Sequence, residues 1–215
     1  MSWFLRSRKE TASAVLQADP GPDVHRSLGL TALLDSMRRK GQGLRILDLG
    51  PAVGSNVEFL SQLGCKLHIG DLYASRSSAV EGEELSQEFF EQLFPADSRF
   101  DVVLAWDLFN YLQRKEMVRL GALIRRNCRP GALVFALMST QKHIPAQPIR
   151  FRMLEGGQLA YERKTGVERP GPRYPPAAIT SFLKGFQVDR SFLLRHGIQE
   201  YLLIREDEEE ETRVM

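Results

Sequence analysis

The sequence predicts an α/β protein with a doubly wound, mostly parallel sheet, helices on both faces of that sheet and a C-terminal antiparallel hairpin. Short apolar runs, typical of strands that are buried on both faces, alternate with segments of helical periodicity. Such alternation requires crossover connections and therefore parallel strands. The last two apolar runs are instead joined by a tight turn, which predicts an antiparallel pair. At 215 residues, 43% of them hydrophobic, the chain is long enough to bury a sizeable core.

The first predicted crossover is the most informative part of the chain. A helical pattern over 23–40 precedes a buried strand over 44–49, and a second helical pattern covers 56–63. Between strand and helix lies the small-residue turn Gly50-Pro51-Ala52-Val53-Gly54, which lets a ligand approach the backbone closely. A second strand over 66–72 includes Asp71, placed 21 residues after Gly50, where a carboxylate can accept both hydroxyls of a ribose.

The rest of the chain continues the alternation. We expect helices over 83–94, 118–127 and 177–184, strands over 100–106 and 132–138, a hairpin of 149–154 with 158–163, and a final strand pair of 186–194 with 200–205. Only 30 residues separate Asp71 from Asp101, which is short for a full β-α-β unit. The third strand is therefore expected to be abbreviated, and residues 78–80 are its only candidate.

The domain boundaries follow from composition. We expect an N-terminal extension over 1–22, one domain over 23–205 and an acidic tail over 206–215. Within the domain, the proline-rich segment 141–176 is expected to be an inserted lid or substrate-recognition element.

Charge gives no strong case for a nucleic-acid partner. The net charge is +2, and six consecutive acids occupy 206–211, so that 28 basic and 21 acidic residues remain in positions 1–205. A basic body would suit an acidic partner such as RNA, but the basic residues do not cluster with aromatic ones as nucleic-acid platforms do. We therefore favour an ordinary solvated surface.

Two cysteines, Cys65 and Cys128, form no C-x-x-C pair and no Cys/His cluster with the spacing of metal ligands. We expect neither a structural zinc nor a disulfide framework. No apolar run approaches the ~20 residues that span a bilayer, and the N-terminus becomes basic too early for a secretory signal. We therefore expect a cytoplasmic protein without a membrane partner.

The order Asp48-x-Gly50-x-Ala52-x-Gly54 has an acid ahead of its first glycine, which suits a cofactor with a cationic amine better than one held by its phosphates. Here the chain resembles the class I S-adenosylmethionine-dependent methyltransferases, whose first motif is (D/E)-x-G-x-G-x-G. Ala52 replaces the middle glycine. Later matches are Phe100-Asp101-Val102-Val103 and Arg129-Pro130-Gly131-Ala132, and the resemblance extends over 44–205.

The resemblance implies S-adenosylmethionine as cofactor and methyl transfer to an oxygen or nitrogen of a small molecule or a protein. Asp48 would hold the amino group of the donor, and capping of the turn is its alternative role. The turn residues would admit the cofactor; they are Gly50, Ala52 and Gly54. Asp71, followed by Leu72, would bind the ribose. Trp106 would pack on the adenine or the acceptor, unless it is simply a core aromatic.

The acid that contacts adenine in this family normally lies in the shortened segment after Asp71. Glu81, Glu83 or Glu84 could replace it, and nothing in the sequence selects among them.

The catalytic residues are expected after the fourth and fifth strands, because ligands of α/β sheets bind at the carboxyl ends of the strands. Asp107 would orient the acceptor or act as a base, and N-capping of the next helix is its alternative role. Tyr111 stands where the family often has histidine. His143 is the histidine best placed to act as a base.

Two other interpretations remain open. A degenerate relative would use the same fold as a non-catalytic binding module, which Ala52 and the short segment 72–100 favour. A nicotinamide-dependent oxidoreductase is disfavoured by the acid before the turn.

Overall fold

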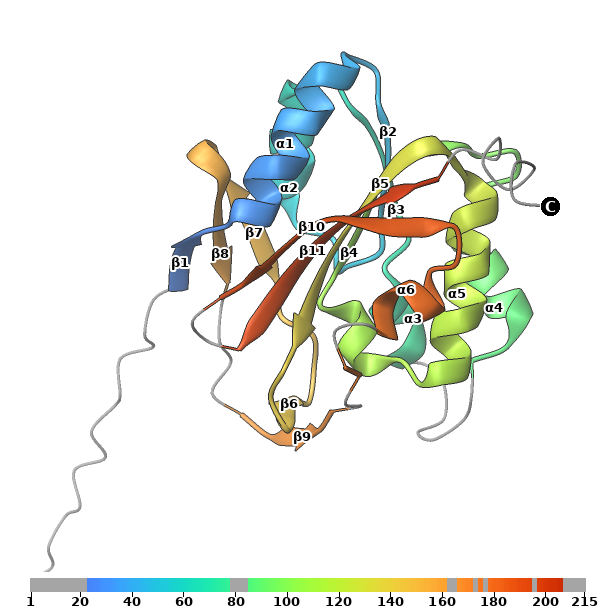
Figure 1. The fold of residues 1–215 in the computed structure, drawn as a ribbon, viewed down its shortest axis with the longest axis vertical. Helices are drawn as coiled ribbons and strands as arrows, with labels where there is room; N and C mark the ends of the chain where they lie inside the picture. Colours follow the sequence, from blue (N-terminus) through green and yellow to red (C-terminus); the bar gives the residue numbers. More distant parts are fainter. Residues whose placement is uncertain are drawn as a thin grey trace, which may run out of the picture.

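A computed structural model describes residues 23–77, 85–161, 166–171, 174–175, 178–194 and 197–206. The central sheet consists of β2 (Arg45–Asp48), β3 (Lys66–Ile69), β4 (Phe100–Trp106), β5 (Cys128–Ser139), β10 (Phe186–Leu193) and β11 (Ile198–Arg205). Its order is β10-β11-β5-β4-β2-β3 (Figure 1). The strands from β5 to β3 are parallel, and the β10–β11 hairpin joins β5 antiparallel. The predicted fold class is confirmed.

Helices cover both faces of this sheet. They are α1 (Leu28–Lys40), α2 (Gly54–Gln62), α3 (Leu72–Ser77), α4 (Gln87–Glu91), α5 (Arg114–Asn127) and α6 (Ala178–Phe182), with two short 3₁₀ turns, η1 (Leu108–Tyr111) and η2 (Glu155–Gly157). Figure 1 shows α1 and α2 together on one side of the sheet and α4, α5 and α6 on the other. None of the helices in the described ranges is both long and apolar enough to cross a bilayer.

The two cores follow from the alternation of side chains along each strand. In β4, Val103 and Ala105 pack in the core beneath α5, whereas Val102, Leu104 and Trp106 belong to the core beneath α1. Because both faces are covered, every residue of β4 is buried, which explains why this strand reads as a continuous apolar run.

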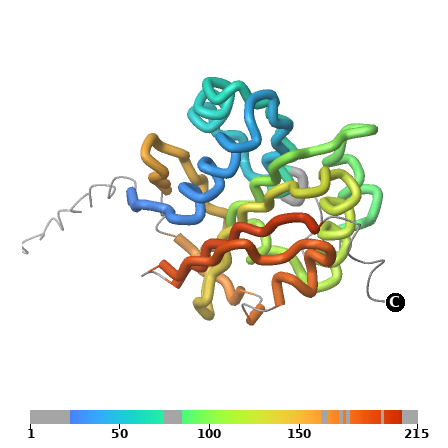
Figure 2. Tube along the Cα trace, turned by 45° about the horizontal axis from the view of Figure 1, so that its top comes forward, coloured from blue at the N-terminus to red at the C-terminus, as the bar shows by residue number. Residues whose placement is uncertain are grey.

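A smaller sheet extends the α1 side of the molecule. It consists of β1 (Asp23–Arg26), β7 (Phe151–Leu154) and β8 (Gln158–Tyr161) in the order β1-β8-β7. The β7–β8 hairpin turns at η2, as predicted, and the tube in Figure 2 shows it beside α1. A separate pair, β6 (His143–Pro145) with β9 (Glu168–Pro170), completes the strands of segment 141–176 in the described ranges.

Three sequence predictions need correction. The strand expected over 66–72 ends at Ile69, and Leu72 begins α3. The helix expected over 23–40 begins only at Leu28, because the Ser27 hydroxyl caps it by accepting from the Leu30 amide at 2.9 Å, and the residues before it form β1. The helix expected over 83–94 is reduced to α4, within the part of it that is described. The strand candidate 78–80 lies outside the described residues, and the described sheet ends at β3.

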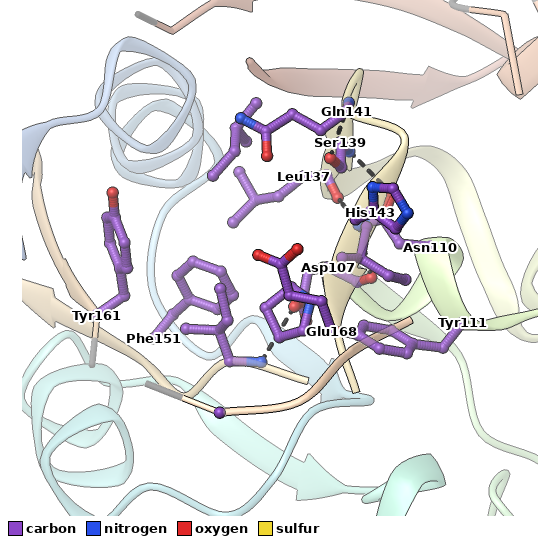
Figure 3. Close-up of a pocket in the computed structure, with 15 residues that line it drawn as sticks. Asp107, Asn110, Tyr111, Leu137, Ser139, Gln141, His143, Phe151, Tyr161 and Glu168 are labelled. Atoms are coloured by element: carbon purple, nitrogen blue, oxygen red, sulfur yellow. Dashed lines mark hydrogen bonds between the residues drawn. The ribbon is translucent and has the colours of Figure 1, made fainter. Parts of the chain in front are cut away.

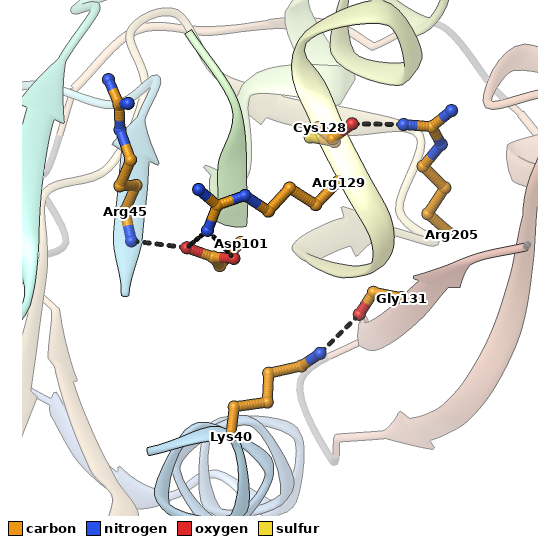
Figure 4. A network of polar contacts seen from close by, with 7 residues as sticks. All are labelled: Lys40, Arg45, Asp101, Cys128, Arg129, Gly131 and Arg205. Atoms are coloured by element: carbon orange, nitrogen blue, oxygen red, sulfur yellow. Dashed lines mark hydrogen bonds and ion pairs between the residues drawn. The ribbon is translucent and has the colours of Figure 1, made fainter. Parts of the chain in front are cut away.

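Asp101 clamps the sheet at the end opposite the carboxyl ends of the strands (Figure 4). Its carboxylate accepts the Arg45 amide at 2.8 Å and the Arg129 guanidinium at 3.0 and 3.2 Å, so it joins β2, β4 and β5. Nearby, Lys40 at the end of α1 donates to the Gly131 carbonyl at 2.8 Å. The motif Phe100-Asp101 therefore stabilises the frame and takes no part in the site.

Candidate functional site

A cavity of about 330 Å³ lies where β4 and β5 end, and Figure 3 shows the residues around it. More than half of its lining comes from segment 141–176. The lining residues are Asp107, Asn110, Tyr111, Leu137, Ser139, Gln141, His143, Ile144, Pro145, Ile149, Phe151, Tyr161, Gly166, Glu168 and Ile198. The three predicted catalytic residues, Asp107, Tyr111 and His143, are all among them. We call this cavity the Asp107 pocket.

Asp107 follows β4 directly and is 7% exposed. Its Oδ2 accepts the Ile149 amide at 3.0 Å, and its side chain does not cap η1, so the alternative capping role is not observed. Burial raises the pKa of Asp107 to about 7, against the opposing effect of hydrogen bonds from the Ile149 amide and its own backbone. A carboxyl with this pKa can exchange a proton with a ligand near neutrality.

Tyr111 and His143 flank Asp107 from different elements. The Tyr111 hydroxyl, at the end of η1, donates to the Gln147 carbonyl at 3.1 Å, and the Arg169 guanidinium lies 5.0 Å from the centroid of its ring. Burial raises the pKa of Tyr111 above its ordinary value, so the phenol stays protonated. His143 is exposed on β6, at the rim of the pocket.

Asn110 shapes the pocket floor, and the sequence did not single it out. Its amide nitrogen donates to the carbonyls of Asp107 at 2.9 Å and Leu137 at 3.0 Å, and its oxygen accepts the Ser139 amide at 2.8 Å. Asn110 thus ties η1 to the end of β5. A polar residue inside the apolar run Leu108-Phe109-Asn110-Tyr111 was the available signal, because a buried amide needs partners.

A side chain of the protein itself, Trp106, lies against the first glycine of the turn. Asp48 is 2% exposed, and its Oδ1 accepts Trp106 Nε1 at 2.7 Å and the Gly50 amide at 3.0 Å. A Cβ at Gly50 would collide with the indole ring of Trp106. Burial raises the pKa of Asp48 to about 6, hydrogen bonds from Trp106 and Gly50 oppose that rise, and the charge of Asp71 adds to it.

The backbone of Trp106 directs its ring toward the turn. Its φ is +48°, which is uncommon for a residue with a side chain, and the β4–β5 register shifts between Leu104 and Trp106. Such a conformation costs about 1–3 kcal/mol and persists only where surrounding contacts impose it.

Phe151 supplies one of those contacts. Its ring stacks on the Trp106 indole at 5.7 Å between centroids and 5° between planes, and it also lines the Asp107 pocket. Asn56, 2% exposed in the first turn of α2, holds this part of β7 by donating to the Phe151 carbonyl and accepting the Met153 amide, both at 2.8 Å. The stacked pair therefore separates the glycine turn from the pocket.

The other predicted cofactor residues lie in different surroundings. Leu72 is fully buried in the core beneath α5. The Asp71 Oδ1 accepts the Ala74 amide at 3.0 Å and so caps α3. Ala52 and Gly54 are exposed, and a Cβ at Gly54 would meet open space. None of the predicted cofactor residues lines the Asp107 pocket. As arranged, the Trp106 indole lies against Gly50, so a donor that occupies this part of the turn would have to displace it.

Comparison with known proteins rests on structure. No family model matches the chain, and no curated protein matches it. A methyltransferase from Clostridium acetobutylicum, described as S-adenosylmethionine-dependent, matches 83% of this chain and 91% of its own at a TM-score of 0.54 and 11% identity. This is the class I methyltransferase fold.

Two further solved structures share the methyltransferase fold at a TM-score of 0.50. Magnesium protoporphyrin IX methyltransferase from Synechocystis, with S-adenosylmethionine bound, is 13% identical over 83% of this chain and 78% of its own. The 1,6-didemethyltoxoflavin-N1-methyltransferase from Burkholderia thailandensis, with its substrate and S-adenosylhomocysteine bound, is 15% identical over 84% and 78%. At these identities the likeness establishes the fold alone.

Proposed function

We propose that this chain binds a small molecule in the Asp107 pocket and uses the methyltransferase fold as a binding module. The observation that carries this proposal is the position of the Trp106 ring, which is hydrogen-bonded to Asp48 and lies against Gly50, while the pocket beside it is open. A fold does not determine an activity, so the function has to be inferred from the residues of the site. The pocket lies where α/β proteins bind ligands, and its volume is at the lower end of the ~300–1,000 Å³ that is usual for such sites.

The free energy needed to move the Trp106 ring off the glycine turn would disfavour binding of a donor there. Emptying the turn would break a hydrogen bond to a buried carboxylate, worth about 1.5–3 kcal/mol, and an aromatic stack, worth about 0.5–1.5 kcal/mol. A ligand that binds only the opened form loses affinity in proportion to the population of that form. A displacement cost of ~3 kcal/mol would weaken donor binding roughly a hundredfold.

Methyl transfer to an oxygen or nitrogen nucleophile, with S-adenosylmethionine as donor, is the second candidate function. The convergence of Asp107, Tyr111 and His143 on one pocket favours it, because Asp107 can accept a proton near neutrality. In that function the pocket holds the acceptor. It also requires the Trp106 indole to leave the turn.

The binding proposal is tested by methyl-detected NMR on the full chain with isoleucine δ1 labels and a fragment library. Ile144, Ile149 and Ile198 line the pocket, whereas Ile124 and Ile179 lie in the core beneath α5 and serve as internal controls. Fragments that shift the first three signals and spare the last two support the proposal. A library that shifts none of the pocket signals, or shifts all five alike, contradicts it.

A further inference from the structure

The lining of the Asp107 pocket contains more acidic than basic side chains. It includes the carboxylates of Asp107 and Glu168, and no lysine or arginine is among the described lining residues. Figure 3 shows both acids among the residues around the cavity. No ion pair within the described ranges involves either carboxylate. The other titratable lining residues are Tyr111, His143 and Tyr161. A cavity with two carboxylates and no lysine or arginine attracts cations and repels anions.

Arg169 lies beside the pocket and contacts one of its lining residues, Tyr111. Arg169 neighbours Glu168 on β9, so strand alternation directs the two side chains to opposite faces. Its guanidinium lies over the ring of Tyr111, with its carbon 5.0 Å from the centroid. Arg169 thus contacts the cavity lining through Tyr111, whereas Glu168 itself lines the cavity.

The remaining walls are apolar and aromatic. Phe151 and Tyr161 are both almost fully buried behind the cavity surface, and Ile144 and Ile198 contribute aliphatic area. Aromatic rings attract cations as well as apolar groups, since the face of a ring carries partial negative charge. Asp107, at 7% exposure, is the more buried of the two carboxylates, and its Oδ2 accepts the Ile149 amide.

We propose that the ligand of this pocket is a small organic amine, bound as a cation, with its ammonium group toward Asp107 and Glu168 and an apolar body against Phe151 and Tyr161. This inference rests on the proposed function, because it names the ligand class of the same pocket. It applies equally if the bound molecule is a methyl acceptor. A neutral alcohol of the same shape gains the apolar contacts without the charge, and a carboxylate of the same shape meets like charge.

The test uses matched trios of probes on the full chain. Each trio carries one apolar body with an amine, a hydroxyl or a carboxylate: 2-phenylethylamine, 2-phenylethanol and 3-phenylpropionate, then the cyclohexyl and indole counterparts. Affinities are measured by titration of the isoleucine signals at low and moderate salt. We expect the amine of at least one trio to bind about tenfold more tightly than its alcohol, as a charge-assisted hydrogen bond implies, and the carboxylate to bind least.

Variants locate the charge that is responsible. Glu168→Gln and Asp107→Asn should each weaken amine binding severalfold and leave alcohol binding unchanged, whereas Asp189→Asn, at an exposed acid of β10, should change neither. Alcohols or carboxylates that bind as well as the amines would overturn this inference and leave the binding proposal standing. Failure of the amine to bind in every trio would also overturn this inference. The fragment library separately tests whether the pocket binds any small molecule.

Discussion

The indole nitrogen of Trp106 lies 2.7 Å from Oδ1 of Asp48, and this hydrogen bond joins the ends of β4 and β2 above the glycine turn. Asp48 is the acid that the methyltransferase resemblance assigns to the donor amine. In this structure its Oδ1 accepts hydrogen bonds from Trp106 and from the Gly50 amide. Trp106 is the last residue of β4, and the residue after it, Asp107, lines the pocket. The end of β4 therefore covers part of the glycine turn and also forms a wall of the Asp107 pocket.

Replacing Trp106 with phenylalanine should keep an aromatic ring on Phe151 and remove the hydrogen bond to Asp48. A buried carboxylate that loses a donor destabilises the protein by about 1–3 kcal/mol. Urea unfolding at pH 8 measures this loss. Asp48→Asn is the matched control, because its amide oxygen can accept the same two hydrogen bonds without a buried charge, and it should be at least as stable as the native protein. Equal stability of Trp106→Phe and the native chain would show that the bond contributes nothing.

Gly50 and Gly54 bracket the turn and should respond differently to alanine. A methyl group at Gly50 collides with the Trp106 ring, whereas Gly54 faces open space at the start of α2. We expect Gly50→Ala to destabilise the fold by about 1–3 kcal/mol through overpacking, and Gly54→Ala to be neutral or stabilising by up to about 1 kcal/mol. Thermal unfolding compares the two. Equal effects would mean that the indole does not rest on the turn in solution.

The sequence supported the fold prediction because strand burial and crossover order are local patterns. The continuous apolar run 100–106 and the paired runs around Glu155-Gly156-Gly157 became β4 and the β7–β8 hairpin. The helix start at Leu28 was missed because the apolar periodicity continues on both sides of Ser27. The capping role of Ser27 therefore did not stand out from the sequence pattern. Propensity alone does not choose between a strand and the first turn of a helix there, since pairing with β8 decides it.

The candidate site was predictable only in part. The rule that ligands bind at the carboxyl ends of strands placed Asp107, Tyr111 and His143 near one another. The state of Trp106 was not predictable, because its left-handed backbone and its stack on Phe151 depend on contacts between segments 45 residues apart. Asn56 read as the start of a helix, and its two hydrogen bonds to β7 cross 95 and 97 positions of sequence.

Asn56 should be a strong determinant of the hairpin position. Asn56→Ala leaves the Phe151 carbonyl and the Met153 amide without their buried partner, so we expect a loss of about 2–4 kcal/mol and faster hydrogen exchange at Met153. Ser55→Ala, one position earlier on the exposed side of α2, is the control and should change little. Unchanged exchange at Met153 would show that other contacts hold β7.

Stability should fall with rising pH on account of Asp107. Its folded-state pKa is raised from 3.8 to about 7, so between these values the unfolded chain releases a proton that the folded chain retains. The contribution to stability is present below pH 4 and is lost as pH rises toward 7. Asp107→Asn removes this dependence. We expect the native chain to lose a few kcal/mol more than the variant between pH 4.5 and 7.5 in urea unfolding. Parallel profiles for the two proteins would contradict the burial of this carboxyl.

Calorimetric titration of the full chain with S-adenosylmethionine and S-adenosylhomocysteine tests the central claim most directly. A Trp106 indole that keeps its place against Gly50 and Asp48 predicts no heat of binding for either compound at concentrations that saturate ordinary donor sites. Binding at low micromolar concentration, abolished by Asp48→Asn, would contradict the closed turn and establish a working donor site.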